Sequence, residues 1–149
     1  MKTIQNQKDK EALLKRLQQL NSNTERRWGL MSAEEMLWHL RSQLELALGL
    51  HDARFQPTGI MTTKLVRWLS IYIVPWPKGF RTARPMNVHR VKPDLLALDE
   101  ERQLLLARLE AVLQSPRLEA HPLFGAISNR AWYRLIWRHF DHHLRQFGL

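Results

Sequence analysis

The 149-residue sequence contains no cysteine. This absence excludes disulfide bonds, thiolate nucleophiles and sulfur ligands to a metal, and it is typical of proteins in a reducing compartment. A long apolar run is missing as well, because the most apolar stretch, LVRWLSIYIVPWP, is shorter than the roughly 20 residues that span a bilayer. The polar N-terminus, MKTIQNQKDK, does not resemble a secretory signal. We therefore expect a cytoplasmic protein that does not span a membrane.

Strand patterns are also missing from the sequence. No stretch alternates apolar and polar residues convincingly, whereas apolar residues recur at the three- and four-residue spacing of amphipathic helices. The sequence predicts one all-α domain over residues 1–149, with four main helices and one short additional helix. The helices are expected at about residues 8–20, Ala33 to Leu50, Thr62 to Tyr72, Leu95 to Leu113, and Ser128 to Phe147.

Prolines separate the short helix from the helix expected at Leu95 to Leu113. Pro75, Pro77, Pro85 and Pro93 prevent a continuous helix or a central strand between residues 74 and 93. We therefore expect a long Pro-rich crossover that packs on the outside of the helices.

Negative charge is scarce, and the formal net charge is +9. This balance favours anionic partners, namely nucleic acid, a membrane surface or small acidic substrates. The basic residues are scattered, however, and no recognition helix or platform of aromatic and basic residues is apparent, so nucleic-acid binding is the least favoured function. A small anionic substrate is the preferred partner, with Arg81, Arg84 and Arg90 as candidate contacts to its carboxylates.

Three of the seven histidines lie in the C-terminal segment RHFDHHLRQFG. Because a helix turns by about 100° per residue, His139 and His143 share one face, and His142 lies at the border of that face. The arginines of the segment lie on the opposite side. The residues that share the face of His139 are mainly apolar: Trp132, Leu135, Ile136, Gln146 and Phe147.

The helix that begins after Ser32 shows the same arrangement. His39 lies between Leu46 and Leu50 on the apolar face, whereas Arg41 and Glu45 point away from it. A single histidine on an apolar face is usually a hydrogen-bonded core residue. Three buried imidazoles on two helices would be satisfied together by one divalent metal, such as zinc, nickel, iron or copper, with a coordination position left open for water or substrate.

The segments WGLMSAEEMLWHL and HPLFGAISNRAWYRLIWRHFDHHLRQFG resemble the DinB-like (DinB/YfiT) superfamily, and within it a bacterial subgroup of unknown function. The resemblance covers about Trp28 to the end. It implies a four-helix bundle of up-down-down-up topology with a long crossover. It also implies a metal held by one histidine of the second helix and a His-x-x-x-His pair on the last, which here are His39, His139 and His143.

Several further residues near this predicted site have two interpretations. Glu35 is expected to form a capping box with Ser32, and it is the one carboxylate nominated as a general base or as a partner of a ligand. Gln146 is expected either to hydrogen-bond a metal-bound water or to pack. His142 is expected at the surface or behind the ligands, and His121 in a loop that orders the approach to the last helix. His51 and His89 are expected to be exposed.

Trp38 and Trp137 fall outside the apolar faces of their helices. Coverage by the crossover is the first expectation and coverage by a second subunit, in a homodimer, is the next.

The sequence thus favours a metal-dependent enzyme that acts on a small substrate. Relatives in the superfamily include transferases and isomerases that use low-molecular-weight thiols, and the resemblance implies thiol transfer in this sense. A metal-dependent hydrolase and a non-enzymatic metal-binding or stress-related protein are the alternatives.

Overall fold

The computed structural model describes residues 1–51, 59–79 and 86–149. Arg81 and Arg84, two of the three predicted substrate contacts, lie outside these residues. Within them the chain is all-helical and has no strand, as the periodicity predicts. It forms six α-helices and one short 3-10 helix, Ile60–Thr62, whereas the sequence predicts five helices. The six α-helices are α1 (Gln7–Gln18), α2 (Ala33–Ala47), α3 (Lys64–Tyr72), α4 (Val88–Val91), α5 (Leu98–Gln114) and α6 (Asn129–Gln146). None of the helices in the described part of the chain is long and apolar enough to cross a membrane.

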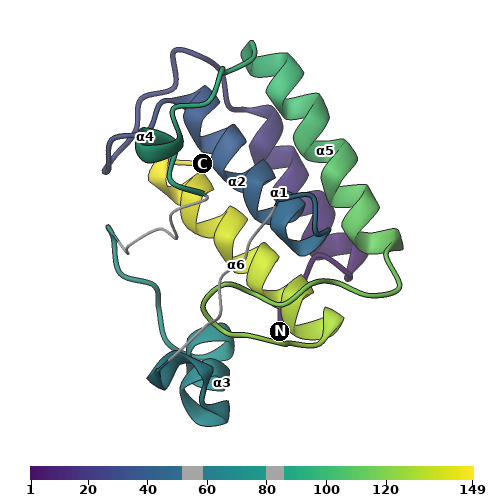
Figure 1. Ribbon diagram of the computed structural model, residues 1–149. Coiled ribbons are helices and arrows are strands. Elements are labelled where there is room, and N and C mark those ends of the chain that lie inside the picture. The colour runs from purple at the N-terminus through teal and green to yellow at the C-terminus, as the bar shows by residue number, and fades with distance from the viewer. Residues whose placement is uncertain (52–58, 80–85) are drawn as a thin grey trace.

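The four long helices, α1, α2, α5 and α6, lie side by side, and α3 and α4 lie at opposite ends of this group (Figure 1). The most extensive contact joins α2 to α5, and α6 packs against α1, α2 and α3. Their facing sides form one apolar core, whose largest fully buried side chains are Trp132 and Phe140 of α6. Burial of such side chains stabilises the fold by about 1.5–3 kcal/mol each.

The N-terminus of α2 begins as the sequence predicts. The Ser32 side chain accepts a hydrogen bond from the Glu35 backbone amide, and the Glu35 carboxylate accepts one from the Ser32 amide at 2.8 Å. Its C-terminus differs from the prediction, because α2 ends at Ala47 rather than near Leu50. Gly49 adopts a φ of 73°, which ends the helix, and the Ala47 carbonyl accepts a hydrogen bond from the Glu119 amide at 2.8 Å.

The start of α5 also differs from the expected Leu95. The helix begins at Leu98, so that the acidic residues Asp99, Glu100 and Glu101 occupy its first turn. Negative side chains there complement the positive end of the helix dipole, which favours this later start.

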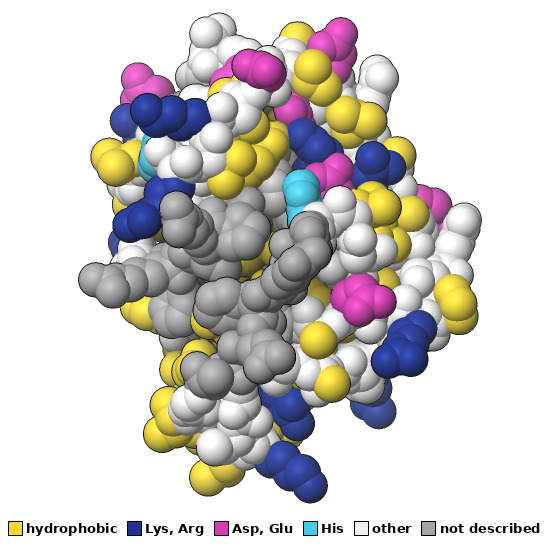
Figure 2. All heavy atoms as spheres, in the orientation of Figure 1, with side chains coloured by type: hydrophobic (Ala, Val, Ile, Leu, Met, Phe, Trp, Pro, Cys, Tyr) yellow, Lys and Arg dark blue, Asp and Glu magenta, His cyan; other side chains and the backbone are white. Residues whose placement is uncertain are grey.

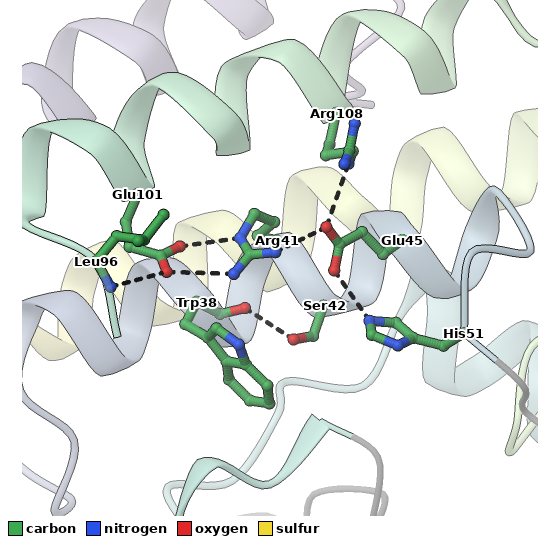
Figure 3. A network of polar contacts seen from close by, with 8 residues as sticks. All are labelled: Trp38, Arg41, Ser42, Glu45, His51, Leu96, Glu101 and Arg108. Atoms are coloured by element: carbon green, nitrogen blue, oxygen red, sulfur yellow. Dashed lines mark hydrogen bonds and ion pairs between the residues drawn. The ribbon is translucent and has the colours of Figure 1, made fainter. Parts of the chain in front are cut away.

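Arg41 and Glu45, which the sequence places away from the apolar face of α2, are nevertheless not exposed to solvent. Arg41 lies between Glu101 of α5 and Glu45 of its own helix, and Glu45 also binds Arg108 and His51 (Figure 3). The Glu101 carboxylate is fully buried, and the Arg41 guanidinium donates to its two oxygens at 2.9 and 3.2 Å. The reason is that α5 covers this side of α2, so the charges pair with one another instead of with water.

Trp38 and Trp137 are both buried within the single chain, with exposed fractions of 5% and 8%. The N-terminal residues contribute to the cover of Trp137. Its ring lies under the N-terminal residues, where the Lys2 ammonium is 5.3 Å from the ring centroid and the Lys2 carbonyl accepts a hydrogen bond from Arg134. Neither tryptophan therefore requires a second subunit to cover it.

The buried ion pair yields a stability prediction. Replacing Arg41 with Met leaves the carboxylate of Glu101 without its partner, and breaking a buried pair costs about 3–5 kcal/mol. We expect Arg41→Met to lower the free energy of unfolding by about 3 kcal/mol, as measured by urea denaturation. The control Arg108→Met removes a more exposed partner of Glu45 and should cost under about 1 kcal/mol. Equal losses in the two variants would contradict a dominant role for the Arg41–Glu101 pair.

Candidate metal centre

Three imidazoles meet in the interior between α2 and α6. His39 comes from α2, and His139 and His143 come from successive turns of α6. All three are buried, with exposed fractions of 3%, 7% and 8%. The Nε2 atom of His139 lies 2.8 Å from that of His39 and 3.0 Å from that of His143. The structure therefore brings together the three histidines that the sequence places on apolar faces.

The other nitrogen of each ring faces an oxygen acceptor. The Nδ1 atoms of His39, His139 and His143 lie 2.8 Å from the Met86 carbonyl, 2.7 Å from Gln43 Oε1 and 2.8 Å from Gln146 Oε1, respectively. A carbonyl or amide oxygen only accepts, so each Nδ1 carries the ring proton and donates it. A neutral imidazole has one such proton, and its Nε2 is then an acceptor with a free lone pair.

Three lone pairs consequently face one another with no hydrogen between them. Moving a proton to an Nε2 would remove the hydrogen bond at that ring's Nδ1. Protonating a ring is opposed by burial, which lowers the pKa of His39 to about 4 and holds the pKa values of His139 and His143 well below the ordinary value. The neighbouring imidazoles lower the pKa of His139 further.

A divalent cation resolves this arrangement, because each Nε2 would donate its lone pair to it. All three ligand atoms lie within 4.8 Å of one another, which places them within reach of a single ion. A tetrahedral zinc site, with zinc–nitrogen distances of about 2.0–2.1 Å, separates its nitrogens by about 3.3 Å. The distances of 2.8 and 3.0 Å between the Nε2 atoms are close to this value. The residues therefore fit the metal that the sequence predicts.

Gln146 lies on the inward face of α6, as expected, and its side chain contacts His143. Its Oε1 accepts from His143, and its Nε2 donates to the Trp28 carbonyl at 2.8 Å, so both halves of the amide are engaged and Gln146 orients His143. The backbone makes room for this amide at Gly29, where a Cβ atom would lie 2.3 Å from Gln146 Nε2. Gly29 also has a φ of 80°, which favours glycine.

A cavity of about 370 Å³ opens beside the three imidazoles. His142 lines it, half-buried, with its ring centroid 5.1 Å from that of His143. His121 lines it as well, and its Nδ1 accepts hydrogen bonds from the amides of Leu123 and Phe124 in the loop before α6. This confirms the loop position of His121. Burial lowers the pKa of His121 to about 3, so it is neutral at pH 7.

Two further predicted site residues that the structure describes, Glu35 and Arg90, do not line the cavity. Glu35 is engaged in the capping box and is not among the residues that line the cavity. Arg90 is exposed and does not line it either. His89 is exposed, as expected, and reaches the wall of the cavity, whereas His51 is only partly exposed and pairs with Glu45 at 2.9 Å.

Sequence reasoning missed the partners of the ring protons. Gln43 lies one turn after His39, so its helical spacing would have placed it on the same face. The Met86 contact uses a backbone carbonyl, which no side-chain pattern reveals.

A family model of proteins of unknown function, DUF1569, matches residues 2–148. The chain belongs to the DUF1569 family. No curated protein and no solved structure matches the sequence. The DUF1569 match extends over α1 to α6, and so it includes all three histidines and their partners Gln43 and Gln146.

The hydrogen bonds to Nδ1 yield a second prediction. In Gln146→Leu, the Nδ1 proton of His143 loses its acceptor and the ring loses its orientation, so we expect metal affinity to fall by about 10–100-fold. Gln146→Glu keeps an acceptor for the Nδ1 proton but loses the hydrogen bond to the Trp28 carbonyl, so it should lose less affinity than Gln146→Leu. Titration of the metal-free protein with cobalt, followed by its visible absorption, measures both. An affinity in Gln146→Leu equal to that of the unmodified protein would show that this contact does not support the ligand.

Proposed function

We propose that His39, His139 and His143 bind one divalent transition metal and that the protein is a metal-dependent enzyme acting on a small substrate. The observation that carries the proposal is the convergence of three unprotonated Nε2 atoms at the wall of a cavity large enough for a ligand. A metal bound by three neutral imidazoles keeps its full positive charge and supplies a Lewis acid to a water or substrate donor.

The residues around the imidazoles orient the three rings. Each Nδ1 proton is donated to an oxygen, namely that of Gln43, Gln146 or the Met86 carbonyl. These hydrogen bonds hold the rings so that the three acceptor Nε2 atoms point to the common centre. Leu135 and Phe124 line the cavity beside the ligands and are themselves buried, so they limit the water that reaches this side of the cavity.

The cavity supports an enzyme more than a protein that only stores metal, because a storage site needs no space for a second molecule. Among the described residues that line it, none is a carboxylate. Hydrolysis usually uses a protein base, and Glu35 is committed to the cap of α2. Transfer of a low-molecular-weight thiol needs no such base if the substrate itself supplies the nucleophile. Thiol transfer is therefore our preferred reaction class, ahead of hydrolysis.

We further propose that this DUF1569 chain has the DinB-like architecture, with α1, α2, α5 and α6 in an up-down-down-up bundle. The long connection from α2 to α5 supports this assignment, as does the placement of one histidine on α2 and two on α6. A cytoplasmic location agrees with the cysteine-free sequence. Lys and Arg side chains are interspersed with acidic and apolar ones on the face shown in Figure 2, which does not favour nucleic acid as the partner.

Elemental analysis of untagged protein tests the proposed ligands. We expect His39→Ala, His139→Ala and His143→Ala each to lower metal occupancy at least tenfold, because two imidazoles hold a divalent ion far more weakly than three. His142→Ala and His89→Ala are the matched controls, since they also change histidines of the cavity wall, and should leave occupancy nearly intact. If all five variants lose metal to the same extent, the three-histidine assignment is wrong.

A further inference from the structure

The chemistry of the cavity wall indicates what the metal centre acts on. None of the described residues that line the cavity is Lys, Arg, Asp or Glu, although the chain as a whole carries a formal charge of +9. Most of the lining side chains are aliphatic, sulfur-containing or aromatic. Arg90, the described member of the predicted carboxylate contacts, is exposed and lies outside the wall.

Several acceptor oxygens of the wall are engaged with the protein itself. The Gln43 and Gln146 oxygens accept from His139 and His143, and the Asn87 side chain accepts from the Arg90 amide at 3.2 Å. The Ser70 carbonyl accepts from two donors, Trp76 Nε1 at 3.0 Å and Arg138 at 2.9 Å. A polar ligand would therefore find these acceptor oxygens already engaged, and a buried polar group without partners is unfavourable.

Two tryptophans and His142 form one aromatic part of the wall. The ring centroid of Trp76 lies 5.9 Å from that of His139 and 6.1 Å from that of His142, and Trp28 lies 6.1 Å from His142 on another side. These rings thus stand directly beside the metal ligands. Aromatic and aliphatic groups gain most from contact with such surfaces.

The position of Trp76 is fixed rather than adaptable. It stands between Pro75 and Pro77, whose rings restrict the backbone, and its indole N–H donates to Ser70. Arg138, the residue before His139, donates to the Ser70 and Val74 carbonyls and lies 5.3 Å from the Trp76 ring centroid. Arg138 of α6 therefore holds the segment that contains Trp76 next to the metal ligand His139.

The cavity also reaches the surface. Leu30 and Val74 line it and are 73% and 47% exposed, so a ligand can enter past them. The volume of about 370 Å³ is more than twice that of the roughly 150 Å³ apolar cavity that admits benzene. It is sufficient for an aromatic ring together with a donor group.

We propose that this cavity selects an uncharged apolar or aromatic group, so that the substrate is a small neutral molecule carrying one metal-binding donor. The inference rests on the proposed function and refines it, because it replaces the acidic substrate expected from net charge with a neutral one. A carboxylate placed against the described wall away from the metal would lose its hydration, and none of the described lining residues is a cation, although Lys78 and Arg138 lie against the rings of Trp28 and Trp76. The net charge of +9 is a property of the whole chain, whereas the residues that line the cavity determine which ligand it binds.

A matched series of hydroxamates on the cobalt-loaded protein tests the proposal. Acetohydroxamate, benzohydroxamate and 4-carboxybenzohydroxamate offer the same donor and differ in a methyl group, a phenyl ring and a charged phenyl ring. We expect benzohydroxamate to bind at least tenfold more tightly than either of the others, as measured by changes in the cobalt spectrum. Acetohydroxamate or 4-carboxybenzohydroxamate binding as tightly as benzohydroxamate would overturn the proposal.

Substitutions of residues that line the cavity test whether its wall causes the preference for the phenyl ring. Trp76→Ala and Trp28→Ala should each reduce the advantage of the phenyl ring at least threefold, with the cobalt spectrum of the unliganded protein retained. The control is Trp68→Ala, which removes a 50% exposed tryptophan of α3 that does not line the cavity and should leave the preference unchanged. Equal effects of the three substitutions would also overturn the proposal.

A measurement without metal separates this proposal from the metal site. Benzamide and 4-carbamoylbenzoate differ only by a carboxylate, and saturation-transfer NMR reports their binding to the metal-free protein. We expect binding of benzamide alone. If cobalt does not bind but benzamide does, the proposed function fails and the apolar selectivity stands. If cobalt binds and the two amides behave alike, the selectivity fails and the metal site stands.

Discussion

A neutral imidazole has one proton for two nitrogens, and in a buried space each nitrogen must meet a suitable partner. In this protein the Nδ1 atoms of His39, His139 and His143 all meet oxygen acceptors, so the three Nε2 atoms are left as acceptors that face one another. Burial lowers their pKa values, which opposes the entry of a proton. One divalent metal would satisfy all three acceptors together.

Each outward hydrogen bond brings a different part of the chain to the centre. Gln43 belongs to α2, Met86 lies just before α4, and Gln146 of α6 is itself held by the Trp28 carbonyl in the segment before α2. Arg138 connects α6 to the C-terminal end of α3, because it donates hydrogen bonds to the Ser70 and Val74 carbonyls. The imidazoles are thus oriented by contacts between segments far apart in the sequence, and the same contacts position the cavity wall. The ion pairs of Arg41 fix α5 against the opposite side of α2.

Much of the helical framework and the three histidines followed from the sequence because their signals are local. Ser32 and Glu35 mark the start of α2, and helical spacing alone places His139 and His143 on one buried face. Features that depend on contacts between distant segments did not follow. The coverage of Trp137 by Lys2, the burial of Arg41 under α5 and the Met86 carbonyl are of this kind. The helical positions of the α2 residues could not show that α5 covers the charged side of this helix. The net charge of the sequence could not show that none of the described residues lining the cavity is Lys, Arg, Asp or Glu.

X-ray absorption at the K-edge of the bound metal tests the central claim most directly. The account predicts a first shell with three imidazole nitrogens at about 2.0–2.1 Å for zinc, with the outer-shell scattering typical of histidine rings. In His143→Ala the imidazole contribution of any bound zinc should fall to two. A shell of oxygen ligands with one imidazole or none in the unmodified protein would contradict the account, because the metal would then bind elsewhere.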